Sequence, residues 1–137
     1  MRAGDRIRIR TVQGRYLVVN ALDDIIVVGM EPPGDNGIFT IGFDEGRIWL
    51  RHAQHHLRDG HWVDRPGLRF NGRFAARWEQ FDLTYVGENR FTLRSAHGHF
   101  MDALENEPVT SMWGLQKETG VFSYEVVDPA NEEQEEI

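Results

Sequence analysis

The chain has no cysteine and only one lysine, Lys117. Without cysteine it can form no disulfide bond and has no thiolate for catalysis or metal binding. It also lacks any run of 18 apolar residues that could cross a bilayer as a helix. Residues 1–6 are not followed by the apolar segment of a secretory signal. We therefore expect a cytoplasmic protein with no membrane partner.

Motifs and charges that would indicate common activities are also missing. The sequence has no Gly-x-Ser-x-Gly elbow, phosphate-binding loop or dinucleotide fingerprint, so we expect no enzymatic activity and no cofactor. The 22 acidic and 15 basic residues give a net charge of −7. Proteins bind nucleic acids through clustered cations, which release counterions from the phosphates. The net negative charge therefore predicts that nucleic acid is not a partner. The length of 137 residues is typical of one domain, and we expect a monomer.

The chain does contain a short sequence motif that occurs three times, which we call the repeated phrase. It begins at Arg6, Arg47 and Arg90, with spacings of 41 (47 − 6) and 43 (90 − 47) residues. Periods of about 20–50 residues indicate a repeat architecture. A large side chain follows each phrase by five residues, and a second strand-like segment closes each unit. The first landmark is Tyr16, Leu57 and Phe100; the second begins at Phe39, Phe81 and Phe122.

Each unit has the pattern of β-structure. Apolar and polar residues alternate in the repeated phrase, and Gln13-Gly14-Arg15 is typical of a hairpin turn. Four short strands per unit predict an all-β fold of about twelve strands, a β-trefoil with pseudo-threefold symmetry. The repeats would span about residues 3–43, 44–86 and 87–127, in one domain of residues 1–128 followed by an acidic, disordered tail at 129–137. The predicted core residues are Ile7, Ile9, Phe39, Ile48, Leu50, Phe81, Phe91, Leu93 and Phe122.

Two motifs resemble a known family. The segment at 93–100, Leu-Arg-Ser-Ala-His-Gly-His-Phe, and the segment at 78–81, Trp-Glu-Gln-Phe, are similar to fascin-like β-trefoil domains. The resemblance covers about residues 3–127 and implies a trefoil with an actin-bundling role. The second unit departs from the pattern, since His55 stands where the turn glycine is expected. The Gln-x-Trp signature of ricin-type trefoils is absent.

The densest polar segment lies in the second unit. Four of the six histidines, His52, His55, His56 and His61, fall within ten residues around the predicted hairpin turn. Neutral imidazole is a common metal ligand, so these four are candidate metal ligands and the turn a candidate for a metal-dependent activity. The alternative is an exposed turn with no ligand.

Indole rings mark a second candidate site. Exposed tryptophan stacks on sugar faces and anchors protein interfaces. Trp62 and Trp113 occupy loop-like positions, Asp64 could orient a ligand, and His55 and His56 add polar contacts. These five residues are the candidate ligand-binding set. Trp49 alternates away from the core, whereas Trp78 is predicted to cap the barrel floor.

The repeated arginines have both a structural and a functional interpretation. They could contact an anion or glycan in three copies, or pair on the barrel wall with acids such as Asp44, Glu45 or Glu88. The structural interpretation is favoured. The function best supported by the sequence is a non-enzymatic recognition module that binds a protein or a carbohydrate through its loops. The alternatives are fascin-type actin bundling and metal-dependent activity at the histidine-rich turn.

Overall fold

Twelve strands and three single-turn helices make up the computed structural model of the chain, which describes residues 1–29, 33–60, 68–103, 108–114 and 117–129. The strands are β1 (Arg6–Thr11), β2 (Tyr16–Val19), β3 (Ile26–Gly29), β4 (Phe39–Asp44), β5 (Arg47–His52), β6 (His55–Asp59), β7 (Leu68–Gly72), β8 (Phe81–Gly87), β9 (Arg90–Ser95), β10 (Phe100–Asp102), β11 (Thr110–Trp113) and β12 (Phe122–Asp128). The 3₁₀ helices are η1 (Asp35–Gly37), η2 (Arg77–Glu79) and η3 (Glu118–Gly120). No helix in the described part of the chain is long and apolar enough to cross a membrane.

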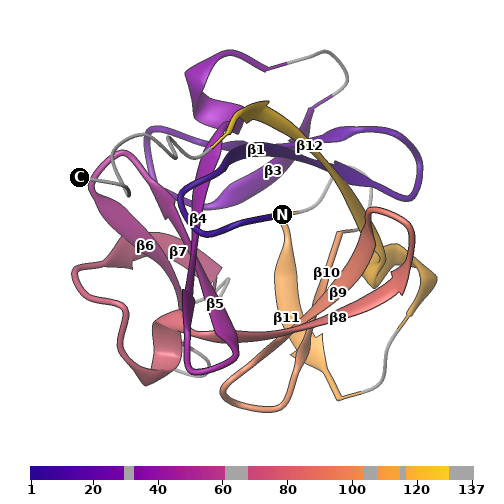
Figure 1. The fold of residues 1–137 in the computed structure, drawn as a ribbon. Helices are drawn as coiled ribbons and strands as arrows, with labels where there is room; N and C mark the ends of the chain where they lie inside the picture. Colours follow the sequence, from indigo (N-terminus) through magenta and orange to yellow (C-terminus); the bar gives the residue numbers. More distant parts are fainter. Residues whose placement is uncertain (30–32, 61–67, 104–107, 115–116, 130–137) are drawn as a thin grey trace, which may run out of the picture.

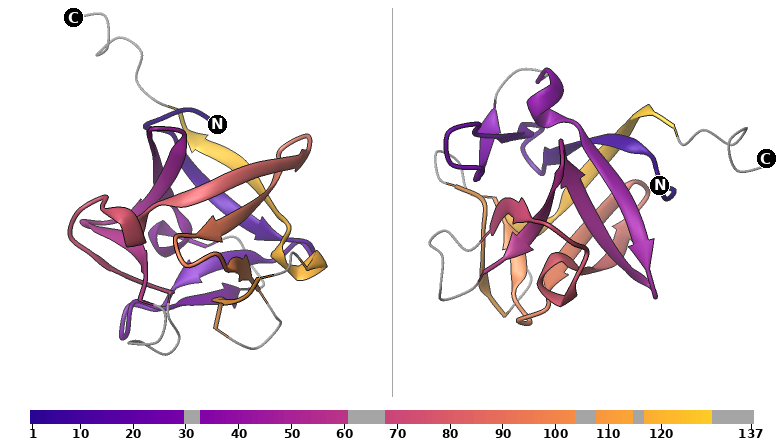
Figure 2. Two further views of the ribbon diagram at one scale, coloured as in Figure 1. Left: turned by 90° about the horizontal axis from the view of Figure 1, so that it is seen from below. Right: turned by 90° about the vertical axis from the view of Figure 1, so that its left-hand side faces the viewer.

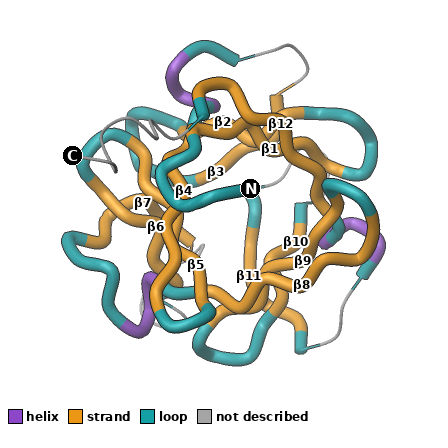
Figure 3. The backbone as a smooth tube through the Cα atoms, viewed as in Figure 1, coloured by secondary structure: helices purple, strands orange, loops and turns teal. Residues whose placement is uncertain are grey.

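Six of the strands close a barrel. β1 pairs with β4, β4 with β5, β5 with β8, β8 with β9, β9 with β12, and β12 returns to β1, all antiparallel. The other six strands form three pairs, β2–β3, β6–β7 and β10–β11. Three similar lobes therefore surround one axis (Figures 1 and 2), with one short helix in each lobe (Figure 3). The prediction of an all-β trefoil is confirmed.

The barrel interior consists of the residues that the alternation predicted. All nine predicted core residues are buried, with at most 2 % of their surface exposed. Three equivalent cross-strand pairs hold the register, namely Ile7 with Phe39, Ile48 with Phe81, and Phe91 with Phe122. Since successive side chains of a strand point to opposite faces, this register places every repeated apolar position inside.

The first hairpin of the second unit differs from the predicted alignment. Strand pairing sets Tyr16 opposite Arg10 and Phe100 opposite Arg94, but it sets His56, not Leu57, opposite Arg51. The second turn is one residue shorter than the other two. Gly14 and Gly98 have φ of 80° and 82° in the longer turns, whereas Ala53 supplies the positive φ, 54°, in the short one. His56 therefore takes the place of the aromatic residue of the other units.

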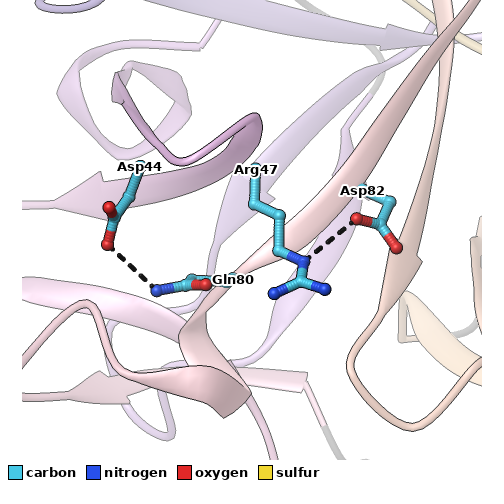
Figure 4. A network of polar contacts seen from close by, with 4 residues as sticks. All are labelled: Asp44, Arg47, Gln80 and Asp82. Atoms are coloured by element: carbon cyan, nitrogen blue, oxygen red, sulfur yellow. Dashed lines mark hydrogen bonds and ion pairs between the residues drawn. The ribbon is translucent and has the colours of Figure 1, made fainter.

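The repeated arginines partly follow the structural interpretation. Arg6 pairs with Asp128 at 3.6 Å, and Arg47 pairs with Asp82 at 3.2 Å (Figure 4). These partners differ from the predicted ones. Asp44 is set opposite Arg47 by the pairing of β4 with β5, but its carboxylate accepts a hydrogen bond from the Gln80 amide. The second arginine of the phrase behaves differently.

That second arginine lies over an aromatic ring in each unit. The guanidinium carbons of Arg10, Arg51 and Arg94 stand 4.6, 5.8 and 5.6 Å from the ring centres of Tyr16, Trp49 and Phe100. Cation–π contact is attractive at these distances. The second unit uses the indole because His56 has replaced the hairpin aromatic.

The acidic tail predicted for residues 129–137 begins where β12 ends. Pro129 is exposed, and residues 130–137 lie outside the described residues, so their predicted disorder stays a prediction.

Candidate functional site

The outer face of the second unit carries a polar and aromatic cluster. On β6, Leu57 and Asp59 are buried, while His56 and Arg58, which alternate with them, are half-buried on the opposite face. On the neighbouring β5, Trp49 points away from the core residues Ile48 and Leu50, as alternation predicted. Its indole lies across Gly42 of β4, where a β-carbon would overlap the ring. Glycine at that position makes room for the tryptophan.

His56 packs against this indole. The two ring centres are 4.9 Å apart and the planes meet at 75°, an edge-to-face contact. Burial lowers the pKa of His56, and the positive charge of Arg51 lowers it further; a backbone hydrogen bond with Gly72 and the charge of Glu79 oppose this shift. The imidazole is therefore neutral near pH 7, with one donor and one acceptor nitrogen.

Glu79 occupies a position that is glycine in the other two units. It ends η2, as Gly37 ends η1 and Gly120 ends η3. A β-carbon on Gly120 would lie 2.9 Å from the carbonyl oxygen of Met101, so this turn normally requires glycine. In the second unit, the space for the Glu79 side chain comes from β7. Gly72 on that strand has no β-carbon, and a β-carbon there would lie 2.6 Å from Cγ of Glu79.

The Glu79 carboxylate is buried and paired with Arg58. The residue is 6 % exposed, and Oε1 lies 3.6 Å from Nε of Arg58. Oε2 of Glu79 and Nδ1 of His56 are both buried without a hydrogen-bond partner among the described residues. Burying such groups is costly unless they are satisfied.

Trp78 and His97 extend the cluster toward the third unit. Arg58 lies over the Trp78 ring at 4.7 Å, and the His97 ring contacts the same indole, with the ring centres 4.8 Å apart. Nε2 of His97 is 3.0 Å from the carbonyl oxygen of Asp59. Asp59 is itself held by a 2.6 Å hydrogen bond from the Ser111 hydroxyl to its carboxylate. Contacts thus run from β6 through η2 to the turn before β10.

We call this set the outer row. It consists of Trp49, His56, Arg58, Trp78, Glu79 and His97. It combines two half-buried indoles with a guanidinium, a carboxylate and two imidazoles, which together present flat apolar surface and directional polar groups. Such a combination suits a ligand with both hydroxyl groups and an apolar face.

The structure describes three of the four histidines that were predicted to bind metal together, and it places His52 and His56 on different faces. The ring of His52 contacts Phe39 and Phe70 on the core side, with Nδ1 3.4 Å from the carbonyl oxygen of Ile38, whereas His56 lies on the outer face. His55 is exposed at the turn opposite His52. Within the described ranges no three His, Cys, Asp or Glu residues are grouped to hold a metal. His61 lies outside those ranges, so its part of the hypothesis stays a prediction.

Of the predicted ligand-binding residues, only His56 is in the outer row. Trp62 and Asp64 lie outside the described residues. Trp113 ends strand β11 opposite Phe100, rather than lying in a loop, and nothing further is described for its side chain.

Sequence reasoning missed Arg58, Glu79 and His97 and assigned Trp78 to the barrel floor. The structure instead shows Trp78 half-buried and in contact with both Arg58 and His97. A signal for two of them was present, since the Trp-Glu pair at 78–79 occurs in the second unit alone, where the others have Asn36-Gly37 and Thr119-Gly120. Arg58 and His97 give no such signal, because each is defined by a contact with a distant segment.

Comparison with solved structures supports the fold. A mosquitocidal holotoxin matches with a TM-score of 0.79 at 8 % identity, over 93 % of this chain but only 18 % of the holotoxin chain. The BEL β-trefoil matches with a TM-score of 0.75 at 16 % identity, over 93 % of this chain and 96 % of that chain. SeviL, solved bound to the asialo-GM1 saccharide, matches with a TM-score of 0.74 at 12 % identity, over 90 % and 98 %.

These likenesses show the β-trefoil fold and do not single out fascin. No protein-family model matches the chain. No curated protein sequence matches it either.

Proposed function

We propose that the protein is a non-enzymatic binding module that recognises a glycan through the outer row of its second unit. The proposal rests mainly on Glu79, a buried carboxylate at a position where both other units have glycine. Two copies of the same turn show that the fold can be built without it. Gly72 makes room for a charged group that the barrel does not need.

The energetics of the Arg58–Glu79 pair favour a functional interpretation. An ion pair with a buried carboxylate must overcome the desolvation of that charge, and an apolar replacement of similar volume is often as stable or more so. The pair does have a geometric effect, since it holds the Arg58 guanidinium over the Trp78 ring. Fixed donors beside an indole are what sugar recognition requires, because sugars offer hydroxyl groups around weakly apolar ring faces.

The fold is compatible with this role, and a trefoil of similar size was solved with a saccharide bound. Fold alone does not determine function, so the outer row carries the argument. Binding of a protein through the same row is the alternative that a blank glycan array would favour.

The test is a glycan array followed by calorimetry with the best ligand. Trp78→Ala and Glu79→Gly should each weaken binding at least about tenfold, which corresponds to about 1.4 kcal/mol. Phe74→Ala is the matched control, because Phe74 is an aromatic residue with 74 % of its surface exposed and lies outside the row. The proposal is wrong if Trp78→Ala and Glu79→Gly bind as tightly as the Phe74→Ala control.

A further inference from the structure

The internal symmetry of the barrel singles out one arginine. Each of the three core pairs Ile7–Phe39, Ile48–Phe81 and Phe91–Phe122 is preceded on its first strand by the first arginine of the repeated phrase. That arginine faces a residue of the neighbouring strand. The three pairs are Arg6 with Thr40, Arg47 with Asp82, and Arg90 with Ser123. The three sites are equivalent in backbone register, so differences between them reflect the side chains.

The charge of two of these arginines is balanced and that of the third is not. Arg47 pairs with Asp82 across the strands, and Arg6 pairs with Asp128 of β12. Arg90 faces the uncharged Ser123, and among the described residues its side chain forms no ion pair or hydrogen bond. Its side chain lies along Gly87, with Cδ 3.5 Å from where a β-carbon would stand.

Arg90 and Ser123 also line a pocket. The pocket has a volume of about 230 Å³ and is bounded by Thr11, Val12, Arg90, Val121, Phe122 and Ser123. Thr11 and Val12 come from the end of β1, while the others come from β9 and β12 with the residue before it, so the first and third units meet here. Since a water molecule takes about 30 Å³ of liquid, the pocket has room for a compact organic molecule.

We propose that this pocket binds the carboxylate of a small organic acid, which would take the position relative to Arg90 that the Asp82 carboxylate takes relative to Arg47. A guanidinium pairs a carboxylate through two parallel hydrogen bonds. The Ser123 hydroxyl can donate a further bond, and Val12, Val121 and Phe122 provide an apolar wall for the body of the acid. The site is separate from the outer row and does not depend on the proposed glycan function.

The experiment is an NMR titration of the full chain at constant ionic strength with sodium acetate, sodium D-glucuronate, inorganic phosphate and D-glucose. Both carboxylates should shift the Arg90 side-chain and Ser123 amide signals, and glucose should not. Arg90→Gln and Ser123→Asp should each weaken acetate binding at least about fivefold. The second change supplies the carboxylate internally, as Asp82 does for Arg47.

Two further variants serve as controls. Ser123→Thr retains the hydroxyl and should retain binding, and Arg47→Gln removes an equivalent arginine that lines no part of the pocket. Loss of binding in Ser123→Asp with retention in Ser123→Thr supports the proposal. Phosphate binding as tightly as the carboxylates would identify a general anion site and overturn it. Absence of shifts at Arg90 and Ser123, or equal losses in Arg90→Gln and Arg47→Gln, would overturn it as well.

Discussion

Single residues explain how one unit of a threefold structure acquires its own surface. Glu79 and Gly72 belong together, since the carboxylate side chain fills the space that the glycine leaves. His56 takes the place of Tyr16 and Phe100 and packs on Trp49 instead of under an arginine. Each change is small, and each is possible only because a neighbouring residue accommodates it.

The fit between Gly72 and Glu79 predicts a non-additive pair of substitutions. Gly72→Ala should lower the free energy of unfolding by about 1–3 kcal/mol, because its methyl group would press on Cγ of Glu79 at 2.6 Å. In a Glu79→Gly background the same change should cost less, since only the His56 carbonyl oxygen at 3.0 Å then opposes it. Urea denaturation of the four proteins measures the coupling. Equal costs in both backgrounds would contradict the packing described.

His56 predicts a dependence of stability on pH. Folding lowers its pKa below the ordinary value of 6.5, so the folded protein binds this proton less readily than the unfolded chain. Its contribution is complete above about pH 6.5 and is lost as the pH falls through the lowered folded pKa. His56→Phe, which restores the ring type of the third unit, should make unfolding less sensitive to acid between about pH 7.5 and pH 5. Identical pH profiles for the two proteins would rule out this role.

At the scale of elements, the first hairpins of the three units use two kinds of turn. The first and third use glycine with positive φ in a longer turn, and the second uses Ala53 in a turn one residue shorter. The shortening changes which residue stands opposite the second arginine of the phrase. A single deleted residue in a turn thus alters the outer face of a whole lobe.

Ala53 should carry a measurable strain. An alanine in the left-handed region costs about 1 kcal/mol relative to glycine, so Ala53→Gly should raise the free energy of unfolding by roughly 0.5–1 kcal/mol. Gly14→Ala is the matched reverse change, since a β-carbon there meets no atom within 4 Å and only the backbone is strained. It should lower stability by a similar amount, as thermal or urea unfolding will show. A loss of stability in Ala53→Gly, or a gain in Gly14→Ala, would show that backbone strain does not govern these turns.

At the scale of the whole molecule, stability depends on closing the barrel. β12 pairs with both β1 and β9 and so joins the end of the chain to its beginning. None of the three units can close the ring alone, because each leaves strand edges that a neighbouring unit must cover.

Truncation tests this dependence. A chain that ends before Phe122 should lose cooperative unfolding, because it removes β12 and opens the barrel. A chain that ends at Pro129 removes four glutamates beyond the last strand and should keep nearly the same Tm. Circular dichroism melts of both chains give the comparison. A drop of several degrees in the longer chain would mean that the acidic tail contacts the folded domain.

Much of the fold could be predicted because the strands and core positions of a barrel built from repeats follow from local sequence pattern. Ile7, Ile48 and Phe91 recur at spacings of 41 and 43 residues, and the period-2 alternation indicates which face of the strand each one occupies. The hairpin alignment of the second unit could not be predicted in the same way. By sequence pattern alone, either Leu57 or His56 could stand opposite Arg51, and only the hydrogen-bonded register shows that it is His56.

The sequence by itself therefore determined the strands, the threefold repeat and the core, because these follow from the order of apolar and polar residues along the chain. The tertiary structure alone decided what the polar residues do. Arg58 reaches Glu79 and Trp78, and Arg90 faces an uncharged serine, only because strands distant in sequence are brought together. Charge pairing and pocket shape act through space at a few ångströms, so a linear pattern does not contain them.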